Sequence, residues 1–225
     1  MPAFRQAAER GFVLEVDVKL SSDGVPVVIH DDTLDRTTDC AGPVNSKTAA
    51  QLASECEIDV LGTEDQTIDL PPGDARRSGI PTLAEVLALL KKSDASANLE
   101  IKNIPTDNDW DPTYDYAEKV ASAVRASGVP GSQLLVQSFT LGNLTRFHQV
   151  HPGPQTSILT LNAVNVAAVD LARNNGIDWV SPQWPIDQGF VSEAHHAGLQ
   201  VVPWTLDSAA EIKAATSLGA DAVIT

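Results

Sequence analysis

Two acidic residues interrupt an apolar stretch near the start of the chain. Glu15 and Asp17 lie two residues apart within the run from Val13 to Leu20, whose valines and leucines are typical of a β-strand. In a strand, residues i and i+2 point to the same face. Two carboxylates on one face of an apolar strand cost free energy unless a partner satisfies them. A divalent cation with oxygen ligands is the natural partner. Ordinary surface charges would instead lie at the ends of the run.

A histidine follows these two acids closely in the sequence. The segment Ser21–Gly24 has the composition of a tight turn, and the short apolar run Pro26–Ile29 then leads into His30. A connection this short cannot make a parallel crossover, so the two runs predict an antiparallel hairpin. His30 would then return toward the level of the two carboxylates. Because histidine titrates near neutral pH, His30 is the best candidate for a general acid or base.

A third acid and a lysine lie in another expected strand. Glu100 and Lys102 belong to the run Asn98–Lys102 and share one face of it, since they are two residues apart. If neighbouring strands bring Glu100 to Glu15 and Asp17, the all-oxygen ligand set predicts Ca²⁺ or Mg²⁺. Lys102 would then place a positive charge beside the cation, which suits a phosphate group, although it could also be a surface lysine at a strand end.

Aromatic and polar side chains end two of the later apolar runs. Trp204 could form a wall for a small apolar or glycerol-like group, although a core aromatic between strand and helix is almost equally consistent with the sequence. Gln137 and Phe139 end another run and could line the same opening. The remaining histidines are expected to be solvated or to cap helices; they are His148, His151, His195 and His196.

The elements that must position these residues follow a regular period in the second half of the chain. Expected strands centre near residues 136, 158, 180, 202 and 223, at spacings of 22, 22, 22 and 21 residues. Helices are expected between them, over 141–150, 164–174, 190–196 and 208–218. Equal βα units of this kind predict a parallel sheet, and their number favours a closed (β/α) barrel. A doubly wound sheet is the alternative, but no glycine-rich phosphate loop follows any expected strand.

The first half of the chain supplies the other elements. Expected helices cover 2–10, 83–92 and 114–127, with a weak helix over 48–53 and a small loop insertion over about 61–79. Counting the strands near Glu15 and Glu100 with the five above gives seven, whereas a barrel of this kind has about eight. The sequence therefore predicts one incomplete α/β barrel domain over 1–225, without its first strand and last helix.

Composition limits the partners. The 225 residues include 43% hydrophobic ones, which is ample for a core, and the net charge of −15 argues against nucleic acid and anionic membrane surfaces. No apolar run approaches the roughly 20 residues of a membrane span, so no stable membrane insertion is expected. The oligomeric state is not indicated by the sequence.

The two cysteines suggest a compartment. Cys40 and Cys56 flank a short segment, and a disulfide closing it would contribute about 3 kcal/mol and imply an oxidising environment. Two free thiols in a cytosolic protein are the alternative, and the absence of a nearby histidine disfavours zinc. We expect an extracytoplasmic protein, secreted or periplasmic, with the cytoplasm as the alternative.

The stretch from Glu15 to Thr38, E-V-D-V-K-L-S-S-D-G-V-P-V-V-I-H-D-D-T-L-D-R-T-T, resembles the core motif of the glycerophosphodiester phosphodiesterases. Shorter matches follow in the same order at residues 80–87, 99–102, 137–139, 203–205 and 222–225. This resemblance implies a phospholipase C-like (β/α)₈ barrel and a phosphoric diester hydrolase. Such an enzyme uses a divalent metal to hydrolyse small glycerophosphodiesters to an alcohol and glycerol 3-phosphate.

The resemblance also implies roles for individual residues. The family's metal ligands match Glu15, Asp17 and Glu100, and its second acid/base histidine matches His30. Its phosphate-binding lysine matches Lys102, and its glycerol-facing tryptophan matches Trp204.

One feature of the family has no match among the 225 residues. The family opens with a strand that ends in His-Arg-Gly, in which the histidine is the other acid/base and the arginine binds phosphate. We therefore expect residues 1–225 by themselves to be inactive or nearly so, and a chain extended by that strand to be active. Two other functions stay open: a related phospholipase C- or D-type barrel enzyme, and an inactive barrel that binds a cation and a phosphate ester.

Overall fold

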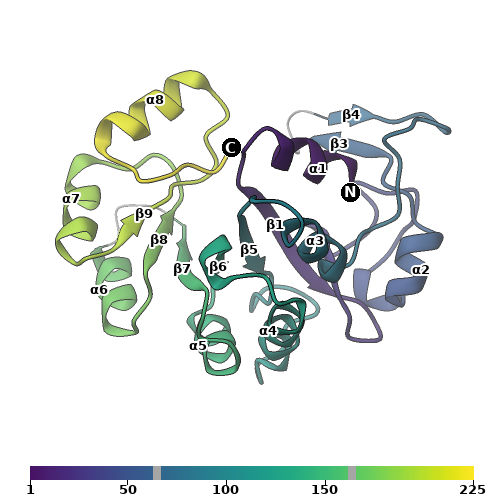
Figure 1. Ribbon diagram of the computed structural model, residues 1–225, viewed down its shortest axis with the longest axis horizontal. Helices are drawn as coiled ribbons and strands as arrows, with labels where there is room; N and C mark the ends of the chain where they lie inside the picture. Colours follow the sequence, from purple (N-terminus) through teal and green to yellow (C-terminus); the bar gives the residue numbers. More distant parts are fainter. Residues whose placement is uncertain (63–66, 162–165) are drawn as a thin grey trace.

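A seven-stranded sheet forms the centre of the molecule (Figure 1). The computed structural model describes residues 1–62, 67–161 and 166–225. The strand order is β2-β1-β5-β6-β7-β8-β9, in which β2 is antiparallel to β1 and every other neighbouring pair is parallel. The strands are β1 (Leu14–Leu20), β2 (Pro26–Val28), β5 (Ala97–Ile101), β6 (Leu134–Ser138), β7 (Gln155–Thr160), β8 (Trp179–Pro182) and β9 (Gln200–Val201).

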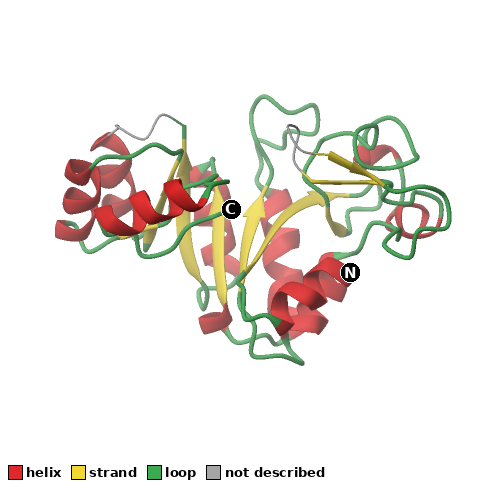
Figure 2. Cartoon of the chain, turned by 90° about the horizontal axis from the view of Figure 1, so that it is seen from above, coloured by secondary structure: helices red, strands yellow, loops and turns green. Residues whose placement is uncertain are grey.

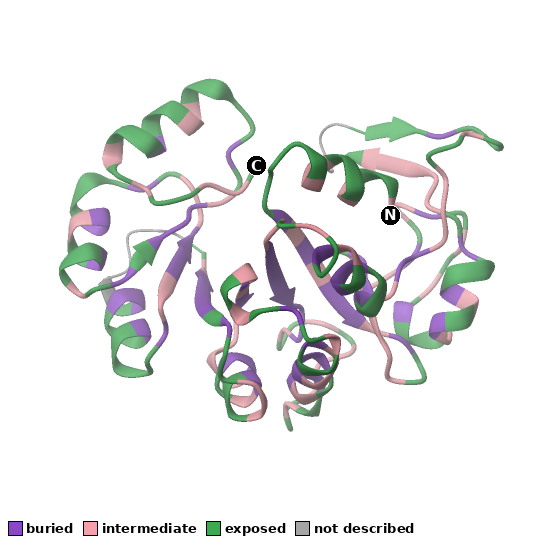
Figure 3. Ribbon diagram, in the orientation of Figure 1, coloured by how far each residue is buried: buried purple, intermediate pink, exposed green. Residues whose placement is uncertain are grey.

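Helices follow the strands around the outer side of the sheet (Figure 1). They are α1 (Pro2–Glu9), α2 (Ala49–Ser54), α3 (Leu83–Leu90), α4 (Asp115–Ser127), α5 (Leu141–Val150), α6 (Val166–Asn174), α7 (Gln188–His196) and α8 (Ala209–Leu218). Short 3₁₀ turns cover Val44–Ser46 and Gly131–Gln133. The alternation of parallel strands and helices confirms the predicted α/β class. Buried residues concentrate on the strands and on the helix faces turned toward them (Figure 3).

Local signals in the sequence explain where several helices begin. Capping boxes open α3, where Thr82 and Glu85 bond reciprocally, and α8, where Ser208 and Glu211 do the same. Each box satisfies two backbone N–H groups that the first helical turn leaves without partners. Helix α4 ends at Gly128, whose φ of 67° suits a residue without a Cβ atom.

The hairpin that carries His30 forms as predicted. Strands β1 and β2 pair antiparallel, with Val18 opposite Val28, and the connecting turn contains Gly24 at a φ of 74°. The β1–β2 pairing leaves the other edge of β1 to β5, which pairs with it in parallel from Leu14 to Val18. Strand β1 therefore links the hairpin to the parallel sheet.

Two expectations about the secondary structure were wrong. The segment around Val223 is not a strand: Asp221 N donates to Val201 O at 2.9 Å and Ile224 N to Pro203 O at 3.0 Å, without the repeated pairing of a ladder. The segment expected as a loop over about 61–79 contains part of a small antiparallel pair, β3 (Val60–Gly62) and β4 (Thr67–Asp69). These strands are short and mostly exposed, so they lack the apolar alternation that reveals a strand. Figure 2 shows this pair apart from the main sheet.

The start of the helix expected over 164–174 lies partly outside the described residues. The helix expected from 164 begins at Val166 in the structure, and residues 164 and 165 lie outside the described part of the chain.

Candidate active site

Three carboxylates meet where β1 and β5 run side by side. The register of the two strands places Glu15 beside Asn98 and Asp17 beside Glu100. Because both strands are parallel and in register, their alternate residues share one face of the sheet. One carboxylate oxygen from each of Glu15, Asp17 and Glu100 lies within 4.8 Å of the others. The three acids identified in the sequence are thus brought together by the pairing of two neighbouring strands.

The surroundings of the three carboxylates disfavour their ionised, negatively charged forms. Glu100 is only 6% exposed, and its Oε1 has no hydrogen-bond partner within the described residues. Burial raises the pKa of Glu15, and the charges of Asp17 and Glu100 raise it further. Burial also raises the pKa of Glu100, which the nearby charge of Lys102 opposes only in part. Buried carboxylates that lack sufficient positive charge, with oxygen atoms only, fit a hard divalent cation such as Ca²⁺ or Mg²⁺.

Lys102 lies beside the cluster as its strand position predicts. Its Nζ is 3.5 Å from Asp17 Oδ1 and 3.7 Å from Glu100 Oε1, and its side chain is largely buried. Burial by itself lowers the pKa of Lys102, but the charges of Glu100 and Asp17 outweigh this effect and the pKa lies above its usual value. Lys102 is therefore a permanent positive charge at the edge of the carboxylate cluster.

Gln137, on β6, lies closer to the carboxylates than the sequence suggested. It was expected to line the substrate opening, but it is 1% exposed and its Nε2 donates to Glu15 Oε1 at 3.1 Å. Its Oε1 accepts a hydrogen bond from Ser181 Oγ at 3.4 Å, and Ser181 and Ser157 share a hydrogen bond of 2.6 Å. A buried polar network thus connects β6, β7 and β8 to the carboxylate of Glu15.

His30 follows β2 and is the most exposed of the candidate residues, with 59% of its side chain accessible. The backbone N–H of Ile29 donates to Asp17 O at 3.0 Å, so His30 comes directly after the residue that pairs with Asp17. The Nδ1 atom of His30 lies 2.7 Å from Asp31 Oδ1. Arg36 donates to both carboxylate oxygens of Asp31, at 2.6 and 2.8 Å, and lowers the pKa of Asp31 to about 2. A permanently charged pair therefore orients the imidazole ring.

Two aromatic side chains identified in the sequence contact each other. The rings of Phe139 and Trp204 meet edge to face, with centroids 5.6 Å apart. Trp204 Nε1 donates to Ser181 O at 2.8 Å, and both rings remain partly exposed. Because Phe139 follows β6 and Trp204 follows β9, the pair lies at the carboxyl ends of the parallel strands.

The other histidines lie elsewhere. His195 Nε2 is 2.9 Å from Asp221 Oδ2, which also accepts from Val201 N in the short strand β9. His196 Nδ1 contacts Ser192 O at 2.6 Å, within helix α7. For His195 and His196, these partners match the helix-end and surface roles expected from the sequence, whereas Nε2 of His151 is buried without a hydrogen-bond partner in the described residues.

Lys19 is a further buried residue near the site that was not predicted from the sequence. It lies two residues after Asp17 on the same face of β1, and it is 0% exposed. Its Nζ forms ion pairs with Asp32, with Asp107 at 2.8 Å and with Asp109 at 3.2 Å. Burial lowers the pKa of Lys19, but hydrogen bonds to Asp107 and Asp32 more than compensate and the pKa is raised. The i, i+2 spacing from Asp17 could have indicated that Lys19 lies on the same face of the strand. The ion-pair partners of Lys19 are too distant in sequence to be inferred.

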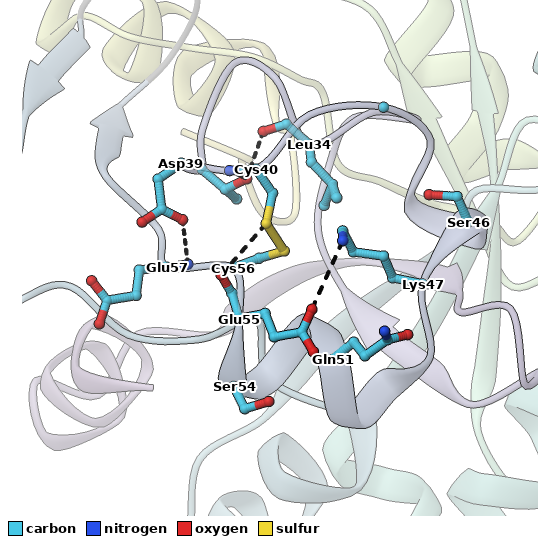
Figure 4. Close-up of a disulfide and its surroundings, with 12 residues drawn as sticks. Leu34, Asp39, Cys40, Ser46, Lys47, Gln51, Ser54, Glu55, Cys56 and Glu57 are labelled. Atoms are coloured by element: carbon cyan, nitrogen blue, oxygen red, sulfur yellow. Dashed lines mark hydrogen bonds and ion pairs between the residues drawn. A yellow bond between two sulfur atoms is a disulfide. The ribbon is translucent and has the colours of Figure 1, made fainter.

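Cys40 and Cys56 form a disulfide in the structure, with Cα atoms 5.3 Å apart (Figure 4). The flanking chain is also joined by hydrogen bonds, since Asp39 Oδ1 accepts from Glu57 N at 2.8 Å. The disulfide closes the segment that follows His30.

The comparisons with known proteins agree with this geometry. The family model described as "Glycerophosphoryl diester phosphodiesterase family" matches residues 1–225. A glycerophosphodiester phosphodiesterase from Bacillus altitudinis is 30% identical over all of this chain and 87% of its own length. Another from Caldanaerobacter subterraneus is 27% identical over 99% of this chain and 86% of its own.

Solved structures show the same fold. An Oleispira antarctica phosphodiesterase, in complex with the product sn-glycerol-3-phosphate, has a TM-score of 0.81 and 23% identity, over 99% of this chain and 85% of its own. A glycerophosphodiester phosphodiesterase from Parabacteroides distasonis has a TM-score of 0.74 and 20% identity, over 100% of this chain and 84% of its own. The architecture is therefore the barrel type of these enzymes, as the βα period predicts. With a family match along its whole length, this chain belongs to the glycerophosphoryl diester phosphodiesterase family.

Proposed function

We propose that this protein hydrolyses glycerophosphodiesters to an alcohol and glycerol 3-phosphate, with Ca²⁺ or Mg²⁺ bound by Glu15, Asp17 and Glu100. The observation that carries the proposal is the convergence of the three carboxylates within 4.8 Å, beside the ammonium group of Lys102. Such a site combines ligands for a cation with a separate positive charge for a phosphate. The glycerol-3-phosphate bound to the Oleispira antarctica relative supports the same class of product.

The protein's own groups have distinct tasks in this proposal. When bound, the cation would supply Lewis acidity that offsets the negative charge of the phosphodiester. Lys102 attracts the phosphate and stabilises the additional charge that develops on its oxygens. Because Asp31 engages Nδ1 of His30, proton transfer is assigned to Nε2. The Phe139–Trp204 pair contributes an apolar wall for the glycerol carbons.

Release of glycerol 3-phosphate from glycerophosphocholine tests this proposal. A chain that carries the expected His-Arg-Gly strand ahead of residue 1 is assayed with Ca²⁺, with Mg²⁺ and with EDTA, and both products are identified. We expect turnover with a cation and loss of at least about 100-fold with EDTA, because a cation contributes several kcal/mol of transition-state stabilisation. Turnover that is unchanged in EDTA would refute the metal requirement.

A pair of matched variants separates the site from general effects. Glu100→Gln keeps the shape of the side chain and removes a ligand charge, so it should reduce turnover as strongly as EDTA does. Glu193→Gln is the control, because Glu193 is exposed on α7. Choline phosphate would indicate a phospholipase C-type enzyme. A phospholipase D-type enzyme would give the same products from glycerophosphocholine, so it is distinguished by faster turnover of phosphatidylcholine than of glycerophosphocholine. Cation and ester binding without any product would indicate an inactive barrel.

A further inference from the structure

Lys19 occupies the centre of a second acidic cluster, separate from the three carboxylates of the proposed metal site. Carboxylate oxygens of Asp32, Asp107 and Asp109 lie within 4.8 Å of one another, which is the spacing of a cation site. The ammonium group of Lys19 lies among them and forms ion pairs with all three. It also donates to the backbone oxygen of Lys102 at 3.1 Å. The position that a cation would take is thus filled by the protein itself.

We propose that Lys19 is a positioning residue whose buried ammonium group replaces a bound cation and joins the segment carrying His30 to the loop at 102–111. This inference rests on the proposed function for the role of His30. The ion-pair partners of Lys19 come from two connections that follow different strands. Asp32 follows β2, whereas Asp107 and Asp109 follow β5. No backbone pairing between these two connections is found in the described residues, so the ion pairs supply the link.

The segment after His30 is anchored on both sides. Asp31 is bound by Arg36, and the next residue, Asp32, is bound by Lys19. Because His30 itself is 59% exposed, packing contributes little to its position. The backbone of Asp32 is also held, because its O accepts from Val44 N at 2.9 Å. Without the ion pair to Lys19, the Asp32 side chain would lose its link to β1 and to the loop at 102–111.

In the loop at 102–111, hydrogen bonds join the two ends, and the ion pairs with Lys19 hold the central part. Asn103 Oδ1 accepts from Asp111 N at 2.7 Å, and Asn103 Nδ2 donates to Asp111 O at 2.9 Å. Between these residues the chain has no helix or strand, and Lys19 binds two of its aspartates. Breaking a buried ion pair by removing one partner is strongly unfavourable, since the remaining charges stay unpaired. The two connections should therefore loosen together when Lys19 is removed.

Kinetics on the extended chain of the hydrolysis assay test the proposal. The variants are Lys19→Met, Asp32→Asn and their double mutant, and the control is Lys91→Met, at an exposed lysine that donates to Ser127 O. We expect kcat for glycerophosphocholine to fall by about 10- to 100-fold in each single variant, because a small misplacement of a reacting group has an effect of this size. Cation affinity should change by less than about threefold, since the ion pairs of Lys19 are with Asp32, Asp107 and Asp109 and not with the carboxylates of the metal site.

The loss of kcat in the double mutant shows whether Lys19 and Asp32 act through one contact or independently. If Lys19 and Asp32 act through one ion pair, the double mutant should lose no more kcat than Lys19→Met alone. Losses that multiply, or single variants with wild-type kcat, would overturn the proposal. Should Lys19→Met fail to fold, Asp32→Asn and Asp109→Asn carry the same test, because both retain the lysine.

Amide hydrogen exchange tests the link between the two connections without relying on enzyme activity. Asp32→Asn should increase amide exchange in both 30–36 and 102–111, with no increase in α7 or β7. If the wild-type protein releases no glycerol 3-phosphate, the proposed function fails, while coupled exchange in both segments would still support the link. Increased exchange in one segment only would refute it.

Discussion

At the scale of single residues, the side-chain amide of Gln137 donates a hydrogen bond that orients the carboxylate of Glu15. Its Oε1 accepts from Ser181, which fixes the orientation of the amide and directs Nε2 to the Glu15 carboxylate. Ser157 supports Ser181 through a hydrogen bond of 2.6 Å. All three polar residues are buried, so water does not compete for these bonds. We propose that Gln137 acts on the cation through its hydrogen bond to Glu15.

Replacing Gln137 with Met should weaken cation binding. Met has a similar volume but cannot donate to Glu15, and loss of such an outer partner typically lowers metal affinity by about 10- to 100-fold. Titration calorimetry with Ca²⁺ measures the effect, and Gln149→Met is the matched control because Gln149 is exposed on α5. Equal Ca²⁺ affinity in the wild type and in Gln137→Met would show that Glu15 does not need this bond.

At the scale of elements, the chain after β2 has a small core of its own. Its buried apolar residues form a cluster separate from the main core: Val27, Ile29, Leu34, Val44, Ala49, Leu52, Cys56 and Ile80. The disulfide between Cys40 and Cys56 closes this region across 16 residues (Figure 4). Since this segment also contains Asp31 and Arg36, its stability bears on the orientation of His30. We propose that it forms in an oxidising compartment, outside the cytoplasm.

Removal of this disulfide should reduce stability. For a loop of this size we expect Cys40→Ser/Cys56→Ser to lower the free energy of unfolding by about 3 kcal/mol. Urea unfolding with and without reductant measures it, and the double variant should be insensitive to reductant. Thiol titration of the unreduced, denatured wild-type protein addresses the compartment: two reactive thiols in protein isolated from its source would favour the cytosol.

At the scale of the whole molecule, the protein is strongly acidic, and the proposed metal site brings three acidic side chains together. The chain carries a net charge of −15. Among the helices that the structure describes, none has both the length and the apolar character needed to cross a bilayer. In the metal-free protein, burial raises the pKa values of Glu15 and Glu100, so the folded state retains protons that the unfolded state releases. The stability of the metal-free protein is therefore linked to pH.

In EDTA, the melting temperature should fall as pH rises above the usual glutamate pKa of about 4.5, up to the raised pKa values of the folded protein. Over that range the unfolded chain binds fewer protons, so each increase in pH favours unfolding. Added Ca²⁺ should oppose this loss and bind more tightly at higher pH, because its ligands must be deprotonated. Scanning calorimetry across this range, with and without Ca²⁺, measures both effects.

The Glu100→Gln variant identifies the source of this pH dependence. It should have a smaller slope of melting temperature against pH in EDTA, whereas Glu193→Gln should keep the wild-type slope. The general repulsion of an acidic protein would affect both variants equally. Identical slopes in both would therefore locate the effect outside the carboxylate cluster.

Much of the site was encoded in local patterns. The alternation of a strand places Glu15 with Asp17 and Glu100 with Lys102, and the short turn after Leu20 dictates an antiparallel hairpin that returns His30. The βα period and the capping boxes are also local, since they depend on residues only a few positions apart. These features could be predicted because neighbouring residues in the chain specify them.

Tertiary structure decided which of these patterns meet. The register of β1 against β5 sets Asp17 beside Glu100, although 83 residues separate them. Gln137 donates a hydrogen bond to Glu15, and Lys19 forms ion pairs with aspartates of two connections. The segment around Val223 was expected to be a strand, but it bonds to 201–206 without a ladder. These outcomes depend on contacts between distant parts of the chain, where packing and the burial of charge, rather than local propensity, select the partners.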